Sequence, residues 1–291
     1  MDRIFFGDNQ FFGVNHMSEE KARQQQMRFQ DLDAIMAVLR NAYEAGVPGF
    51  MCTTHERIGE VVKRIRQDRQ NWDGFYFLPG MPYAHKYANA VTEHGYLGAL
   101  KQFLPKEGLL DAAIRGGKAI ATKDIQSMMT LLVDAEMRMF DGFNTPIIFL
   151  QNIVTDLLLG LGMQDAFAVF AKHVKARYGA EPGFFTMNLP MLLPVLHRAG
   201  LENPVVCANV NKLGFRMSGG IEAYRDACDR YPAKVIAMSV LASGAIPAAE
   251  AIEWVCNESY VQSIVFGASS RANIASTVQL IRQFDSERRS A

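Results

Sequence analysis

Three residues of the chain could transfer protons if the fold brings them together. Asp8 follows the apolar run "RIFFG", and His55 and Glu56 follow a second apolar run, "GFMCT". An imidazole beside a carboxylate can move a proton next to a carbonyl group, as isomerases and lyases require. We therefore expect His55 and Glu56 to act as acid and base, with Asp8 orienting or assisting them.

A stretch near the C-terminus, "SIVFGASSRANI" (263–274), has the features of a phosphate site. An apolar run stops at Gly267, small residues follow, and a helical pattern starts after Arg271. Small residues let backbone N–H groups approach an anion, and a helix N-terminus adds partial positive charge. The stretch predicts a phosphate cradle at Gly267, Ala268, Ser269, Ser270 and Arg271. A turn that only caps the last helix is the alternative.

Amides and cations follow several of the other apolar runs. Amides hydrogen-bond hydroxyl and carbonyl groups, and paired cations can hold a carboxylate or a phosphate. This set favours a small anionic substrate that is phosphorylated or carboxylated and sugar-like. The expected substrate-binding residues are Asn9, Gln10, His85, Gln151, Asn188, Asn209, Asn211, Lys212 and Arg216.

A divalent metal is a less favoured use of the same residues. The ligand types of Asp8, His55, Glu56 and His85 suit zinc or manganese. No recognised ligand spacing supports such a site, so we expect no metal.

These residues must be positioned by elements that alternate along the whole chain. Eight short apolar runs predict strands, and each is followed by a segment of helical periodicity. Eight such units predict an α/β fold, a single (β/α)8 or TIM barrel over residues 1–291 whose candidate residues meet at one end. The runs are 3–7, 49–53, 74–79, 146–152, 183–188, 204–211, 234–240 and 263–268.

Two segments depart from simple repetition. Residues 80–145 leave room for extra helices between the third and fourth strands, and residues 8–30 suggest an exposed helix or a lid. A doubly wound open sheet is the competing fold. Its phosphate loop belongs near the N-terminus, whereas the strongest candidate here follows the last strand, which favours the barrel.

Several segments resemble the aldo/keto reductase superfamily. "GFFTMNLPMLLPVLHRAGL" is similar to that family's fifth-strand segment, and "VLASGAIPAAEAIEWVCNESYVQSIVFGASSRANIASTVQLI" to its seventh- and eighth-strand run. "EAGVPGFMCTTHERIGEVV" resembles its second-strand region. The resemblance implies NADP as cofactor. Its phosphates would lie at residues 267–270, with Arg271 near a 2′-phosphate, Thr186 and Asn188 at the nicotinamide, and Ser239 at the cofactor from the seventh strand.

The family's catalytic tetrad of Asp, Tyr, Lys and His is missing from the matching positions. No carboxylate stands at Met51 or Cys52, "FLPG" (77–80) stands where the Lys belongs, and Gln151 where the His belongs. Reducing a carbonyl needs a proton donor of matched pKa beside the developing alkoxide. The resemblance therefore implies the fold but leaves the reaction open.

Composition excludes several other classes. Thirty basic residues balance thirty acidic ones, which argues against nucleic-acid binding, and no apolar stretch is long enough to cross a membrane. Four cysteines without CxxC spacing and the lack of a secretion signal predict reduced thiols in a cytoplasmic protein. A homo-oligomer is compatible with the sequence, which does not specify the oligomeric state.

The sequence thus favours an enzyme that acts on a small anionic substrate by isomerase- or lyase-type proton transfer. The first alternative is a divergent NADP-dependent oxidoreductase that uses His55, Tyr83 or Lys86 as a substitute proton donor. The second alternative is a non-catalytic barrel that binds a metabolite.

Overall fold

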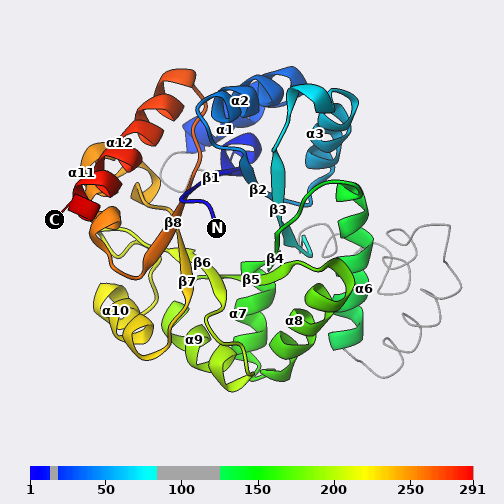
Figure 1. Cartoon of the computed structure of the whole chain (residues 1–291), viewed down its shortest axis with the longest axis vertical. Helices are drawn as coiled ribbons and strands as arrows, with labels where there is room; N and C mark the ends of the chain where they lie inside the picture. The colour runs from blue at the N-terminus through cyan, green and yellow to red at the C-terminus, as the bar shows by residue number, and fades with distance from the viewer. Residues whose placement is uncertain (14–18, 84–124, 291) are drawn as a thin grey trace, which may run out of the picture.

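Eight parallel strands close into a barrel in the computed structural model, which describes residues 1–13, 19–83 and 125–290. Each strand pairs with the next along the chain, and β8 pairs with β1 to close the ring (Figure 1). The strands are β1 (Ile4–Gly7), β2 (Gly49–Thr53), β3 (Tyr76–Met81), β4 (Ile147–Leu150), β5 (Glu181–Thr186), β6 (Val205–Asn209), β7 (Lys234–Met238) and β8 (Val261–Phe266).

Helices surround the barrel and cover its outer face (Figure 1). The α-helices are α1 (Glu19–Arg28), α2 (Leu32–Glu44), α3 (Glu56–Gln67), α6 (Ile125–Met137), α7 (Asn152–Gly160), α8 (Asp165–Tyr178), α9 (Leu189–Arg198), α10 (Gly220–Arg230), α11 (Ala248–Asn257) and α12 (Arg271–Ser290). Short 3-10 helices are η1 (Asn9–Phe12), η2 (Arg69–Asn71), η3 (Arg138–Phe140) and η4 (Ala242–Gly244).

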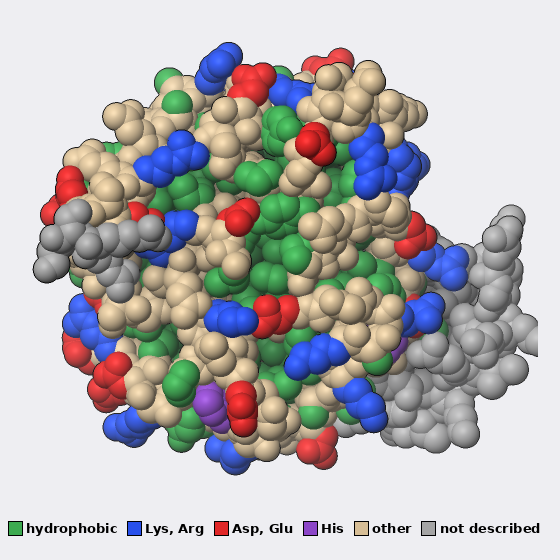
Figure 2. Space-filling view, in the orientation of Figure 1, with side chains coloured by type: hydrophobic (Ala, Val, Ile, Leu, Met, Phe, Trp, Pro, Cys, Tyr) green, Lys and Arg blue, Asp and Glu red, His purple; other side chains and the backbone are tan. Residues whose placement is uncertain are grey.

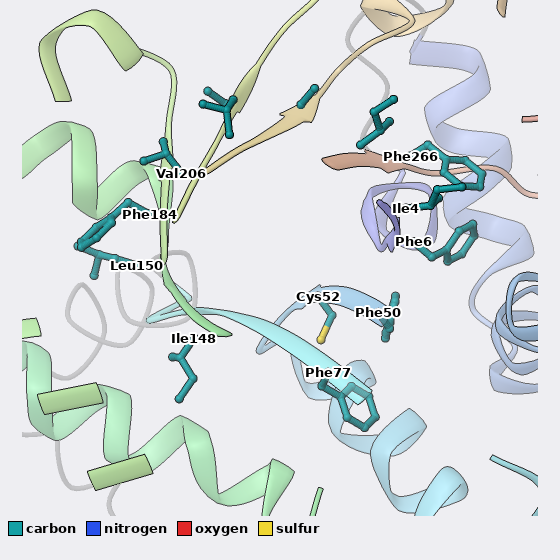
Figure 3. Close-up of a cluster of buried hydrophobic side chains, with 14 of the residues drawn as sticks. Ile4, Phe6, Phe50, Cys52, Phe77, Ile148, Leu150, Phe184, Val206 and Phe266 are labelled. Carbon is teal, nitrogen blue, oxygen red and sulfur yellow. The ribbon is translucent and has the colours of Figure 1, made fainter. Parts of the chain in front are cut away.

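The strands bury both faces because their residues are apolar at successive positions. One set of side chains points away from the barrel axis towards the helices, among them Phe6, Phe50, Phe77 and Phe184 (Figure 3). The alternate set forms a second buried cluster. Because strand side chains alternate between faces, this second cluster fills the barrel interior. It comprises Phe5, Met51, Leu78, Ile147, Phe149, Val205, Cys207 and Ile236.

The helices begin and end where the sequence signals predict. Asp31 caps α2, its carboxylate accepting a hydrogen bond from the backbone N–H of Asp33 at 2.9 Å. Gly179 ends α8 in the left-handed conformation, with φ of 62°, which a residue without Cβ adopts at little cost.

The predicted barrel is confirmed, with all eight strands near their expected positions. The expected helix in residues 8–30 is α1, and α6 is one of the expected extra helices between β3 and β4. The other candidates there, including His85 and Lys86, lie outside the described residues. The four cysteines form no disulfide, and three are buried.

The surface carries charges of both signs. Figure 2 shows acidic and basic side chains interspersed on one face of the molecule, with apolar side chains between them. Within the described residues, no helix combines the length and apolar character that crossing a membrane requires.

Candidate active site

The candidate residues gather at one end of the barrel. Because all eight strands are parallel, their C-terminal ends share that end, and the loops after them form its mouth. The residues that follow β1, β2 and β8 therefore belong to the same mouth, as the sequence requires if Asp8, His55 and Ser269 are to serve one ligand.

Asp8 is held against the end of β2. Its Oδ2 accepts hydrogen bonds from the backbone N–H of Thr53 at 2.7 Å and from the Thr53 hydroxyl at 2.8 Å. The side chain is 6% exposed. Burial raises the pKa of Asp8 to about 6, although the Thr53 hydrogen bonds lower it. Asp8 is therefore a carboxyl group that can change protonation near neutral pH.

This carboxyl lies beside Met51 and Cys52, where the resemblance to the aldo/keto reductases leads one to expect an Asp and the sequence has none. Burial, and then the negative charge of Asp8, raises the pKa of the Cys52 thiol, which belongs to the residue that precedes Thr53. The second strand thus has no acid of its own, and the first strand supplies one to the end of the second.

Tyr83 and His55 lie next to each other beyond the ends of β3 and β2. Their rings are 5.7 Å apart in an edge-to-face arrangement, and the His55 ring is 4.5 Å from that of Phe12. Burial, and then the Asp8 charge, raises the pKa of Tyr83. His55 Nδ1 accepts a hydrogen bond from the backbone N–H of Arg57 at 3.1 Å, so His55 also caps α3.

Glu56 does not join this group in the structure. It is the first residue of α3 and its side chain is exposed, with no described contact to Asp8 or His55. Its place at a helix N-terminus suits a carboxylate, because the helix dipole is positive there. The carboxylate that is hydrogen-bonded to the segments carrying His55 and Tyr83 is a different one.

Glu136 of α6 is that carboxylate, and the sequence analysis missed it. It is 3% exposed and accepts hydrogen bonds from the Thr54 hydroxyl and from the backbone N–H of Tyr83, at 3.1 Å to Oε2. The available signal was a charge on an apolar helical face, since Glu136 shares a face with Met129 and Val133.

The polar residues after β5 are occupied within the chain. Thr186 is fully buried, donates to Asp156 Oδ1 of α7 at 2.6 Å and accepts from the backbone N–H of Asn188 at 2.8 Å. Asn188 in turn caps α9 by accepting from Met191 N–H. Burial raises the pKa of Asp156, a second carboxylate that the sequence analysis missed. These contacts hold the β5 exit and do not extend a Thr186 hydroxyl into the mouth.

Asn209, at the end of β6, has one buried polar atom without a partner. Its Nδ2 donates to the backbone carbonyl of Arg216 at 3.0 Å, which fixes the orientation of the amide. Its Oδ1 is buried and has no hydrogen-bond partner within the described structure. Buried polar atoms are usually bonded, so Oδ1 is a candidate acceptor for a ligand. Asn209 Nδ2 contacts Met187 and Arg216, which line a shallow hollow of about 440 Å³ together with Gly214, Met217 and Ser218.

The other candidates of the β6 loop have partners. Asn211 exchanges two hydrogen bonds with the backbone of Phe215, at 2.8 and 2.9 Å. Lys212 pairs with Glu250 at 2.8 Å on the surface, and the Arg216 guanidinium lies over the Phe215 ring at 5.5 Å.

Three further candidates lie around the mouth. Gln151 is buried directly after β4 and precedes α7, and Asn9 is exposed. Ser239, after β7, has a φ of 56°, an uncommon backbone conformation for a residue with a side chain.

The anion cradle predicted from the sequence falls at the β8–α12 junction. No acceptor in the described structure engages the backbone N–H groups of residues 267–270, whereas Ser270 Oγ caps α12 by accepting from Asn273 N–H at 3.2 Å. Arg271 points to the surface and pairs with Glu44 at 3.3 Å. Gln10 packs against Gly267 so closely that a Cβ atom added to Gly267 would lie 2.1 Å from Gln10 Oε1.

The described residues include no cluster of side chains that could hold a metal ion. No group of three or more His, Cys, Asp or Glu side chains with metal-binding geometry occurs among the residues that the structure describes. His85, one of the four ligands considered from the sequence, lies outside them.

Comparison with known proteins finds similarity in fold alone, and the similar structures include aldo-keto reductases. No protein-family model matches the chain, and no curated protein matches it in sequence. The structure of PA4992 from Pseudomonas aeruginosa, named as a putative aldo-keto reductase, is similar over 97% of this chain and 91% of its own, with a TM-score of 0.60 and 13% identity. The aldose reductase of Giardia lamblia is similar over 96% and 87%, with a TM-score of 0.54 and 12% identity.

A third similar structure contains a nucleotide. It is a variant of the protein Gox0644 in complex with NADPH, similar over 96% of this chain and 83% of its own, with a TM-score of 0.51 and 11% identity. The chain described here therefore has an aldo-keto-reductase-like (β/α)8 fold, and its strand ends carry no Asp, Lys or His at the tetrad positions expected from the sequence.

Proposed function

We propose that the protein is an NADP-dependent oxidoreductase that interconverts a carbonyl compound and an alcohol. The observation that carries the proposal is the Asp8 carboxyl, which is hydrogen-bonded to the end of β2. The second strand itself has no acid at the position of the aldo/keto reductase Asp. A proton donor with a pKa of about 6 suits a carbonyl reduction near neutral pH. The fold supports the proposal, since the similar structures include reductases and an NADPH complex.

The residues of the mouth fit a dinucleotide at two separate places. The unbonded N–H groups of 267–270 suit its phosphates, because they lie at a helix N-terminus. The buried, unpartnered Asn209 Oδ1 suits an N–H donor such as that of a carboxamide. When bound, NADPH would supply the hydride.

The contribution of the chain is then to move one proton and to hold the groups around it. Protonated Asp8 donates from Oδ1 to the developing alkoxide, while the two Thr53 hydrogen bonds fix Oδ2. Tyr83, whose pKa is raised, remains a neutral phenol and can donate a hydrogen bond to the same oxygen. Glu136 positions Tyr83 through its backbone N–H, and the ring of His55 lies against that of Tyr83.

The first test is cofactor binding, followed by turnover. Titration of the protein with NADPH and NADH, followed by nucleotide fluorescence, should give saturable binding of NADPH. Consumption of NADPH should then be measured with a panel of aldehydes and ketones, for wild type and Asp8→Asn. Binding together with turnover that is lost in Asp8→Asn would support the proposal, and absence of NADPH binding would refute it.

Proton transfer without a cofactor is the alternative that the Asp8 pKa also favours. An isomerase or lyase of a phosphorylated or carboxylated substrate would use the same carboxyl as acid and base. It predicts exchange of a substrate C–H proton with solvent deuterium in the absence of nucleotide. This exchange, detected by NMR, would separate the two reactions.

A further inference from the structure

Gln10 occupies the space in which a ligand phosphate would meet the β8–α12 junction. The 3-10 helix η1 follows β1 directly and turns the Gln10 side chain back over the strand ends. Its Nε2 donates to the backbone carbonyl of Gly7 at 2.7 Å, while its Oε1 lies over Gly267, on the neighbouring strand end. The side chain is 6% exposed.

The orientation of this amide leaves its oxygen without a partner. The bond from Nε2 to Gly7 fixes which end of the amide faces Gly267, because exchanging the two ends would bring two carbonyl oxygens together. Oε1 is therefore buried beside Gly267, and no donor bonds it within the described residues. A buried acceptor with no donor is costly and needs an explanation.

The groups around Oε1 explain why this buried oxygen is tolerated without a donor. The backbone N–H groups of 267–270 have no acceptor in the described structure, and the first turn of α12 adds partial positive charge. The partial negative charge of a carbonyl oxygen suits that position. A phosphate oxygen would suit it better still, but the two cannot occupy the same volume.

We propose that Gln10 is a gate residue of the anion cradle, which it fills in the unliganded protein and must leave when a phosphate-bearing ligand binds. The proposal rests on the proposed function only in the identity of that ligand, a dinucleotide. Opening breaks the bond from Nε2 to Gly7 and moves Oε1 away from Gly267. Gln10 therefore lowers affinity for any phosphate that enters, and so sets the threshold at which the site fills.

Titration calorimetry with inorganic pyrophosphate tests the gate without requiring turnover. Gln10→Ala removes the occupant, so pyrophosphate should bind about 5-fold more tightly, the factor that one hydrogen bond of ordinary strength represents. Gln10→Glu places a negative charge over the cradle and should weaken binding by more than 10-fold, as a buried like charge does. Gln70→Ala, at an exposed glutamine, should leave the affinity unchanged.

Gly267→Ala tests the contact itself, even if Gln10→Ala proves poorly stable. The new Cβ would stand 2.1 Å from Oε1, so in wild type it must displace Gln10. Gly267→Ala should therefore lower the melting temperature in the wild-type background and have little effect in the Gln10→Ala background. Equal effects in both backgrounds would show that Gln10 does not occupy this space, and would overturn the inference.

The remaining outcomes separate the gate from the proposed function. Tighter pyrophosphate binding by Gln10→Ala without NADPH binding by any variant would keep the gate and refute the oxidoreductase. NADPH-dependent turnover with unchanged or weaker pyrophosphate binding in Gln10→Ala would keep the oxidoreductase and refute the gate. No pyrophosphate binding by any variant would overturn the gate as well.

Discussion

At the scale of single residues, the chemistry depends on the protonation of Asp8. Its folded pKa of about 6 lies above the usual value of 3.8 because burial disfavours the charge. The acid form donates the proton in carbonyl reduction. We therefore expect kcat/KM for reduction to fall as pH rises above about 6, and the rate of alcohol oxidation to rise over the same range. Asp8→Asn should lose 10²- to 10⁴-fold in kcat/KM, about the contribution of a general acid.

The same substitution should increase stability. A raised folded pKa means that the folded state binds more protons than the unfolded chain, so the ionised carboxyl costs stability increasingly between pH 4 and 6 and fully above that range. Asp8→Asn should thus unfold at a higher temperature than wild type at pH 8, with a smaller difference at pH 5 and a much smaller one at pH 4. Equal melting temperatures at pH 8 would show that Asp8 is not buried as a charge.

At the scale of elements, α6 holds the exits of β2 and β3 in place through one side chain. Glu136 accepts from the Thr54 hydroxyl and from Tyr83 N–H, two buried donors on different loops. Glu136→Ala leaves both without this acceptor and should lower the free energy of unfolding by about 2–4 kcal/mol. Glu136→Gln retains one acceptor oxygen and should cost less than half as much, as measured by urea denaturation.

A kinetic measurement separates positioning by Glu136 from proton transfer by it. If Glu136 only holds Tyr83 in place, Glu136→Gln should lower kcat while the apparent pKa near 6 stays with Asp8. A shift of that pKa by a unit or more in Glu136→Gln would assign part of the titration to Glu136.

At the scale of the whole molecule, closure of the barrel joins the two ends of the chain. Arg3, just before β1, binds both carboxylate oxygens of Asp285 in α12, with contacts of 2.7 Å to each, and donates to the Val261 carbonyl at 3.0 Å. The pair is partly buried, with side-chain exposures of 22% and 18%. Bidentate geometry of this kind is stronger than a surface ion pair.

Removing that connection should weaken the entire barrel. We expect Arg3→Ala to lower the free energy of unfolding by about 2 kcal/mol, and Arg3→Lys by about 1 kcal/mol because lysine cannot form the two-pronged contact. Arg230→Ala removes an exposed pair with Asp226 at 3.9 Å and should change stability by less than about 0.5 kcal/mol. Similar losses in Arg3→Ala and Arg230→Ala would contradict a special role for closure.

The order and type of the elements could be predicted from local patterns in the sequence. Apolar runs such as "GFMCT" and helical faces such as that of Leu32, Ile35 and Leu39 are local patterns, and eight alternations leave few arrangements other than a barrel. The barrel then requires that Asp8, His55 and Ser269 share one end. The absence of the catalytic tetrad could also be predicted from the sequence, because it depends only on which residue types stand at the matching positions.

The contacts between side chains of different loops could not be predicted in this way. Asp8 binds Thr53, Glu136 binds Tyr83 N–H from 53 positions away, and Gln10 covers Gly267. Thr186 instead turns outward to Asp156. Strand register and the packing of each loop set these contacts, and neither leaves a periodic trace in the sequence. A periodic pattern states which face a side chain occupies, whereas a hydrogen bond depends on two atoms approaching within about 3 Å.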